Sequence, residues 1–157
     1  MGKTFLACKI IEQISKISEV TGIKISSHFH PVKKDNVLIE TNEFIIVKET
    51  EISGKDSSLM LQAGAIKVYF VMAAQENLQN AFLWLNKVLP EEAIVCESGG
   101  LGEIADPGVF LFVKNTDDQI VKKGYVQFSP RIVENNGENF DFNIRDISFD
   151  NNRFSLK

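Results

Sequence analysis

The stretch Lys67-Val68-Tyr69-Phe70-Val71-Met72-Ala73 is the strongest single indication of the fold. Its residues are apolar on both faces of a strand, and residues 78–89 then repeat apolar side chains at helical spacing up to Pro90. Residues 93–96 form another short apolar run. Strands that are apolar on both faces and alternate with helices are typical of a largely parallel sheet covered on both sides. We therefore predict an α/β protein with a mostly parallel sheet between two layers of helices.

The residues before this strand predict a helix, a strand and a hairpin. Residues 5–20 form an amphipathic helical pattern, with Gly22 as the expected C-terminal cap. Residues 23–27 are typical of a short strand. Residues 37–39 and 44–47 are rich in β-branched side chains and predict the hairpin.

The C-terminal third has a different pattern. Residues 109–113 predict one more buried strand, whereas residues 126–133 and 140–154 alternate apolar with polar side chains. Turns are expected at Asn135-Asn136-Gly137 and at Asp150-Asn151-Asn152. We expect an antiparallel β extension over about residues 120–157. Because no repeat or low-complexity linker is present, residues 1–157 are predicted to form a single domain.

Composition and charge exclude several classes of protein. The 157 residues include 17 Lys and Arg against 21 Asp and Glu, a formal net charge of −4. This balance argues against nucleic acid as a partner, because non-specific binding to phosphates depends on positive charge. No apolar run approaches the roughly 18–20 residues of a membrane span. Two cysteines and the lack of a secretory leader pattern predict a reduced, cytoplasmic protein.

The first pattern that carries chemistry is Gly2-Lys3-Thr4, directly before the first predicted helix. In a phosphate-binding loop, G-x-x-x-x-G-K-[ST], backbone N–H groups hold the phosphates, the lysine meets the terminal phosphates and the hydroxyl binds Mg²⁺. Only the last three residues of that loop are present, since Met1 stands where the loop would still be in progress. An ordinary helix N-terminus is the competing interpretation.

Three further segments accompany Gly2-Lys3-Thr4 in order along the chain: residues 27–31 (SHFHP), residues 54–65 (GKDSSLMLQAGA) and residues 94–99 (IVCESG). In this order and spacing, the first 115 or so residues resemble the P-loop accessory proteins of molybdopterin-guanine dinucleotide biosynthesis. No counterpart is assigned to the chain from Glu134 onward.

This resemblance implies a P-loop NTPase-like fold that binds GTP or ATP, with Lys3 on the β- and γ-phosphates and Thr4 on Mg²⁺. It implies weak NTPase activity at most, and a possible protein partner in cofactor assembly. Where the family has a complete phosphate loop, this sequence has only its last three residues, which puts the phosphate cradle in doubt.

Two acidic residues are candidates for the same site. Glu97 follows a predicted strand at the edge where open α/β sheets bind ligands, and there an acid can coordinate Mg²⁺ or orient an attacking water. The alternative for Glu97 is a solvated strand end. Asp56 either faces the same ligand or, together with the nearby Ser57, is a candidate cap of a short helix that Gly64 closes.

The segment Asn115-Thr116-Asp117-Asp118 fits an N-x-x-D pattern. There Asp118 can accept the two guanine N–H groups and Asn115 can brace the pocket. Guanine sites of the G-protein type usually have lysine after the asparagine, and Thr116 stands there instead, which favours a plain polar turn.

His28 and His30 lie in one H-x-H segment just after a predicted strand. Alternate side chains of an extended segment point the same way, so two imidazoles can bind a metal such as Zn²⁺ or reach phosphates. A structural zinc site needs about four ligands, and no cysteine pair lies nearby. The alternative is a pair that lines the ligand cavity or has no function.

The strand that should precede the phosphate loop is a physical problem, because its loss leaves backbone groups unpaired. Either that strand lies upstream of Met1, or a tail strand or a partner subunit fills its place. The apolar stripe of the first helix would then favour a homodimer or larger assembly. Three functions remain: a nucleotide-binding accessory protein, a degenerate module that binds another protein, and a metal-binding module.

Overall fold

The computed structural model describes residues 2–118 and 128–157. The α-helices and the strands of the central sheet are, in chain order, α1 (Lys3–Ile14), β1 (Val20–Ser26), β2 (Val37–Glu40), β3 (Phe44–Glu49), α2 (Asp56–Gln62), β4 (Lys67–Ala73), α3 (Leu78–Asn86) and β5 (Ala93–Glu97). The C-terminal strands are β6 (Leu111–Asn115), β7 (Arg131–Asn135), β8 (Ile147–Asp150) and β9 (Arg153–Leu156). None of the helices formed by the described residues is long and apolar enough to cross a membrane.

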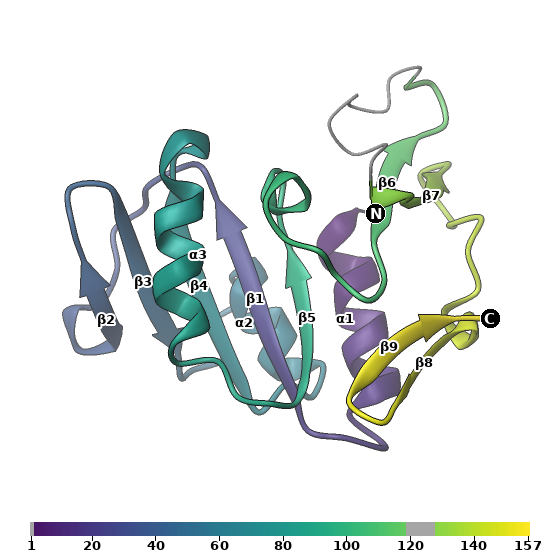
Figure 1. Cartoon of the computed structure of the whole chain (residues 1–157), viewed down its shortest axis with the longest axis horizontal. Helices are drawn as coiled ribbons and strands as arrows, with labels where there is room; N and C mark the ends of the chain where they lie inside the picture. Colours follow the sequence, from purple (N-terminus) through teal and green to yellow (C-terminus); the bar gives the residue numbers. More distant parts are fainter. Residues whose placement is uncertain (1, 119–127) are drawn as a thin grey trace.

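The central sheet is mixed, with its described strands in the order β2-β3-β4-β1-β5 (Figure 1). The pairs β4/β1 and β1/β5 are parallel, whereas β2/β3 and β3/β4 are antiparallel. Helices α1 and α2 lie on one face and α3 lies on the other. The expected three-layer, mostly parallel P-loop NTPase-like sheet is therefore wrong. The reason for the difference is the β2–β3 hairpin. Because β3 pairs antiparallel with β4, half of the strand pairs in this sheet are antiparallel.

Two separate clusters of apolar side chains cover the two faces of the sheet. On one face, α1 and α2 pack on β1 and β5 through Ile11, Ile14, Val20 and Met60, all 1% exposed or less. On the other face, α3 packs on β3 and β4 through Leu78, Ala81 and Leu85. The strand β4 is consequently buried on both sides, as its sequence predicts.

Gly22 lies in the middle of β1, so its predicted role as the C-terminal cap of the first helix is wrong. The helix α1 ends at Ile14 and its cap is Ser15. The reason for the glycine is a close approach by α2, because a Cβ at position 22 would lie 3.0 Å from Met60 Sδ and 3.2 Å from Val68 Cγ2.

The C-terminal segments form two small sheets, so the expected antiparallel β extension is only partly correct. Strand β7 pairs in parallel with β6, and the rest of the strand expected over residues 126–133 lies partly outside the described residues. Only β8 and β9 form an antiparallel hairpin. Its turn at Asn151 and Asn152 is as predicted, and both residues have positive φ.

These segments cover the outer side of α1. Side chains such as Phe149 and Phe154 pack against the cluster that contains α1, and Gln13 Nε2 donates to the carbonyls of Ile144 and Ile147 at 3.1 and 2.9 Å. Most of the apolar stripe of α1 is therefore buried within the chain, although Phe5 at its start is 46% exposed. The reason offered for a homodimer, an uncovered stripe on this helix, does not hold, and the oligomeric state stays a prediction.

We expect Gly22→Ala to lower the free energy of unfolding by about 1–3 kcal/mol, because overpacking forces α2 away from β1. Urea denaturation followed by circular dichroism measures this change. Gly99→Ala is the matched control, since nothing lies within 4 Å of a Cβ built there, and it should shift stability by less than about 0.5 kcal/mol. Equal losses in the two variants would contradict the close packing of Met60 on β1.

Candidate functional site

The carboxyl ends of β4, β1 and β5 meet at one edge of the sheet, beside the first turn of α1. A polar cavity of about 470 Å³ opens there. Its lining includes Lys3, Lys24, Glu97, Ser98 and the glycines that follow. In open α/β sheets this edge is where ligands bind, because loops and helix N-termini converge on it.

The centre of this site is the carboxylate of Glu97, a side chain only 7% exposed at the end of β5. Thr4 Oγ1 donates a hydrogen bond of 2.7 Å to Glu97 Oε2. Lys24 Nζ donates one of 2.6 Å to Glu97 Oε1. Thr4 and Glu97, which the sequence places 93 residues apart as candidate Mg²⁺ ligands, thus lie in direct contact, and Glu97 is not a solvated strand end.

Lys24 is the residue of this cluster that the sequence analysis missed. It lies on β1 between two apolar neighbours, its side chain is 16% exposed, and its Nζ also lies 3.4 Å from Thr4 Oγ1. A buried ammonium is costly unless it is paired. A lysine inside an apolar strand is therefore the indication that could have revealed it, because such a residue requires a nearby acid.

Lys3 is the first residue of α1, and its side chain is exposed beside the Thr4–Lys24–Glu97 cluster. Within the described residues its ammonium has no ion pair or hydrogen bond. The free N–H groups of a helix N-terminus add partial positive charge at the same place. Lys3 is consequently available to an anion that enters the cavity. Gly2, the N-cap of α1, lines neither this cavity nor the larger one described below.

The loop after β5 closes one side of the polar cavity. Ser98 Oγ accepts hydrogen bonds from the backbone N–H groups of Gly100 and Leu101, at 3.1 and 3.0 Å. A Cβ at Gly100 would collide with Gln75, which lies just past β4. The loop packs against the Gln75 side chain, whose flexible end would have to move aside for any larger residue at position 100.

Asp56 lies at the margin of the site. It is the first residue of α2, while Lys55 is the N-cap, so the predicted capping role is wrong. Its side chain is 64% exposed, and Oδ2 lies 3.8 Å from Lys24 Nζ. Asp56 lines neither cavity, and its influence on the site is an electrostatic one through Lys24.

Asn115 and Asp118 form a local turn at the end of β6. The Asn115 N–H donates to Asp118 Oδ2 at 3.1 Å, and Asp118 N–H donates to the Asn115 carbonyl at 3.0 Å. Neither residue lines a cavity described here. This geometry is that of the plain polar turn, the alternative to a guanine site.

His28 and His30 are both exposed after β1 and line neither cavity. The His30 ring stacks on Phe70, with centroids 6.5 Å apart, and the backbone N–H of His30 donates to Met72 Sδ. Among the described residues, no group of three or more His, Cys, Asp or Glu side chains could hold a metal ion. The structure therefore gives the histidine pair no further ligands.

The donor set of the site matches one mode of Mg²⁺ binding. Mg²⁺ commonly takes one or two protein oxygens and completes its shell with waters and substrate phosphates. The Thr4 hydroxyl and the Glu97 carboxylate are oxygens of that kind and are already adjacent. Each Glu97 oxygen accepts one hydrogen bond and keeps a second lone pair, so these residues could contribute to an Mg²⁺ shell that waters and phosphate complete.

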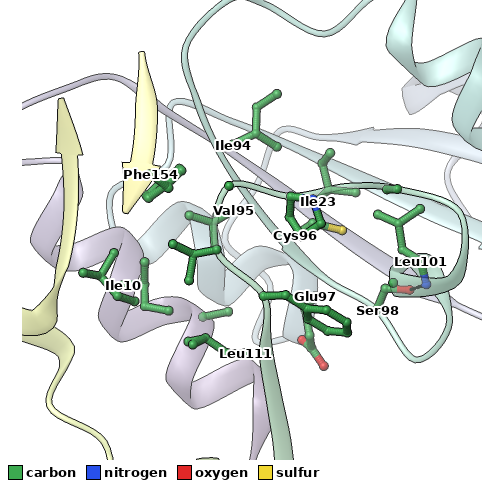
Figure 2. A pocket seen from close by; sticks show the side chains of 18 of the residues that line it. Ile10, Ile23, Ile94, Val95, Cys96, Glu97, Ser98, Leu101, Leu111 and Phe154 are labelled. Carbon is green, nitrogen blue, oxygen red and sulfur yellow. Dashed lines mark hydrogen bonds between the residues drawn. The ribbon is translucent and has the colours of Figure 1, made fainter. Parts of the chain in front are cut away.

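A second, apolar cavity of about 600 Å³ runs along the outer edge of β5 (Figure 2). Val95 and Ile10 lie on its α1 side, whereas Ile94, Cys96 and Leu101 lie on the other. The thiol of Cys96 is open to this cavity, but the surrounding walls and the Glu97 charge raise its pKa to about 12.

A double-mutant cycle tests the Lys24–Glu97 pair. We expect Lys24→Met to lower the free energy of unfolding by about 3 kcal/mol, because it leaves a buried carboxylate without its cation. The double variant Lys24→Met/Glu97→Leu should recover most of that loss, since two apolar groups need no partner. Urea denaturation of both proteins measures the difference, and additive losses would show that the pair is not coupled.

The thiol chemistry of Cys96 gives a pH-dependent prediction. In a Cys8→Ser protein, Cys96 should react with iodoacetamide about 30- to 100-fold more slowly at pH 8 than a free cysteine, since few thiolates form below a pKa of about 12. The rate should rise about tenfold per pH unit while the fold persists. Mass spectrometry of the alkylated protein follows it, and a rate that levels off near pH 9 would contradict the raised pKa.

Comparisons with known proteins give no information on the function of this chain. No family model, no curated protein and no solved structure matches the chain. The resemblance to the molybdopterin-guanine dinucleotide accessory proteins stays a prediction from the sequence.

Proposed function

We propose that the protein binds a small phosphate-bearing ligand, of which Mg-GTP and Mg-ATP are the first candidates, in the polar cavity at the carboxyl edge of β1 and β5. The observation that carries this proposal is the Thr4–Lys24–Glu97 cluster: Lys24 and Glu97 line that cavity, and Thr4, which lines neither cavity, is joined to it by its hydrogen bond to Glu97. The cavity volume of about 470 Å³ falls within the range of small-molecule sites.

The charges around the cavity suit an anion accompanied by a divalent cation. Lys3 is exposed and unpaired within the described residues, so it can meet a phosphate without losing another contact. Lys24 already donates to Glu97 and lies 3.4 Å from the Thr4 hydroxyl. Bound Mg²⁺ would supply the charge that draws phosphate oxygens and the carboxylate together, and Thr4 and Glu97 are the residues that would hold it.

Binding, rather than turnover, is the activity that this geometry supports best. A general base must lie within hydrogen-bond reach of the water that it deprotonates. Glu97 is only 7% exposed and already contacts Thr4 and Lys24, and Asp56 lines neither cavity. These contacts give Glu97 the role of an anchor for the basic and hydroxyl side chains.

Calorimetric titration with Mg-GTP and with Mg-ATP tests the proposal. We expect saturable binding that Lys3→Ala weakens by at least about tenfold, because one charged contact to a phosphate is worth about 1.5–3 kcal/mol. Lys3→Ala should leave the urea midpoint unchanged, since the side chain is exposed and has no partner among the described residues.

Lys16→Ala is the matched control, because it removes the same charge from an exposed lysine that follows the C-terminal end of α1 and does not line the cavity. It should bind both nucleotides as the original protein does. Equal weakening in both lysine variants would indicate non-specific charge attraction. An absence of heat at millimolar concentrations of both nucleotides would overturn the proposal.

A further inference from the structure

The outer edge of β5 is a strand position that no described strand fills. Among the described residues, β5 pairs only with β1, although it lies next to the apolar cavity of about 600 Å³ (Figure 2). A strand edge presents a row of N–H and C=O groups that another extended chain can pair with. Here that edge lies within a trough, and we call the cavity the β5 trough.

The path of the chain through α1 and β1 indicates where a further strand would fit beside β5, and in which direction it would run. Helix α1 begins beside Glu97 at the carboxyl edge of the sheet, and β1 begins opposite Ala93 at the amino edge. The helix therefore runs against the strand direction, as the helix of a β-α-β crossover does. Such crossovers are right-handed in about 98% of cases.

Handedness decides where a strand paired with this crossover would lie. On one face of the sheet, α3 leads from β4 across β1 to β5. Helix α1 lies on the opposite face of the sheet. A right-handed crossover on that face must run across the sheet in the opposite direction, from a strand outside β5 to β1. The position of that strand is the β5 trough, and its direction is parallel to β5.

Size and wall chemistry agree with an extended apolar segment. A strand residue occupies about 3.3 Å along the strand, about 4.8 Å between strands and about 10 Å between layers, so roughly four residues fill 600 Å³. Most of the lining is apolar: Ile10, Val95 and Leu111 line the α1 side, and Ile94 and Leu101 line the other. Charged residues such as Asp106 and Arg153 also line the cavity. A segment that is apolar on both faces, like β4, matches these walls.

We propose that the β5 trough receives a four- to five-residue apolar segment of a partner polypeptide, which adds to the sheet as a strand parallel to β5. The walls favour a single extended segment over a second copy of the chain. Pro107, Phe110 and Phe154 line the trough outside β5, and two β5 edges cannot come within strand-pairing distance while both carry these walls.

The probe is a synthetic peptide, acetyl-Lys-Lys-Val-Ile-Val-Ile-Asp-amide, titrated into the whole protein without nucleotide. We expect binding below about 1 mM, together with slower hydrogen exchange at the amides of β5 and no change at the opposite edge strand β2. Two control peptides carry N-methyl groups on alternate backbone amides, one control for each register. One control should bind at least about tenfold more weakly and the other should not, because only one set of amides faces β5.

Variants separate this surface from the phosphate site. Cys96→Arg places a long charged side chain in the β5 trough and should abolish peptide binding, whereas Leu83→Arg, an exposed position on α3 outside the trough, should not. Thr4→Val, at a proposed Mg²⁺ ligand that does not line the trough, should retain the peptide while it weakens nucleotide binding. If Cys96→Arg does not fold, the two methylated controls decide on the original protein.

Three results would overturn the inference. The first is an absence of peptide binding at about 1 mM. The second is equal weakening by both methylated controls, which indicates apolar adhesion without strand pairing. The third is concentration-dependent dimerisation that protects β5 without peptide, which assigns the edge to a second copy of the chain. Light scattering over a tenfold range of protein concentration measures the last result.

Discussion

The rest of the structure depends on one buried carboxylate. Glu97 ends β5, and its two oxygens accept hydrogen bonds from α1 through Thr4 and from β1 through Lys24. Charge-assisted hydrogen bonds of this kind are the strong ones, and a buried carboxylate without them is costly. The contact therefore fixes the start of α1 over the carboxyl edge of the sheet. It also places Lys3, which has no partner among the described residues, beside the polar cavity.

Once α1 is held in this position, its other sides must be covered. One side packs on β1 and β5, and the outer side packs against the C-terminal segments, where Gln13 bonds to the carbonyls of Ile144 and Ile147. This arrangement buries most of the apolar stripe of the helix. It also leaves the β5 trough between β5 and the C-terminal segments, because α1 overhangs a strand edge that no described strand fills. The polar cavity and the β5 trough share a boundary at Lys3 and Glu97 but present opposite chemistry.

The candidate site was partly visible in the sequence. Thr4 before a helix and Glu97 after an apolar strand follow from local pattern, because parallel strands bring their carboxyl ends to one edge. The role of Lys24 in the site was missed because a lysine between two isoleucines is typical of a strand with one solvent-exposed face, and the sequence does not show its partner Glu97. The turn at Asn115 and the exposed His28 show the converse: a spacing typical of ligand binding also occurs where side chains only satisfy nearby backbone groups or face solvent.

Local pattern was sufficient for elements whose residues interact within a few positions. The buried character of β4, the β2–β3 hairpin and the turn at Asn151 follow from strand periodicity and from the tolerance of asparagine for positive φ. Strand direction, the parallel pairing of β6 with β7 and the role of Gly22 depended on contacts between distant segments. An apolar strand has the same side-chain pattern whether its neighbour is parallel or antiparallel, and the sequence around a glycine does not show which helix will pack against it. Strand direction and the contact at Gly22 are therefore decided only when hydrogen bonds and packing form across the whole chain.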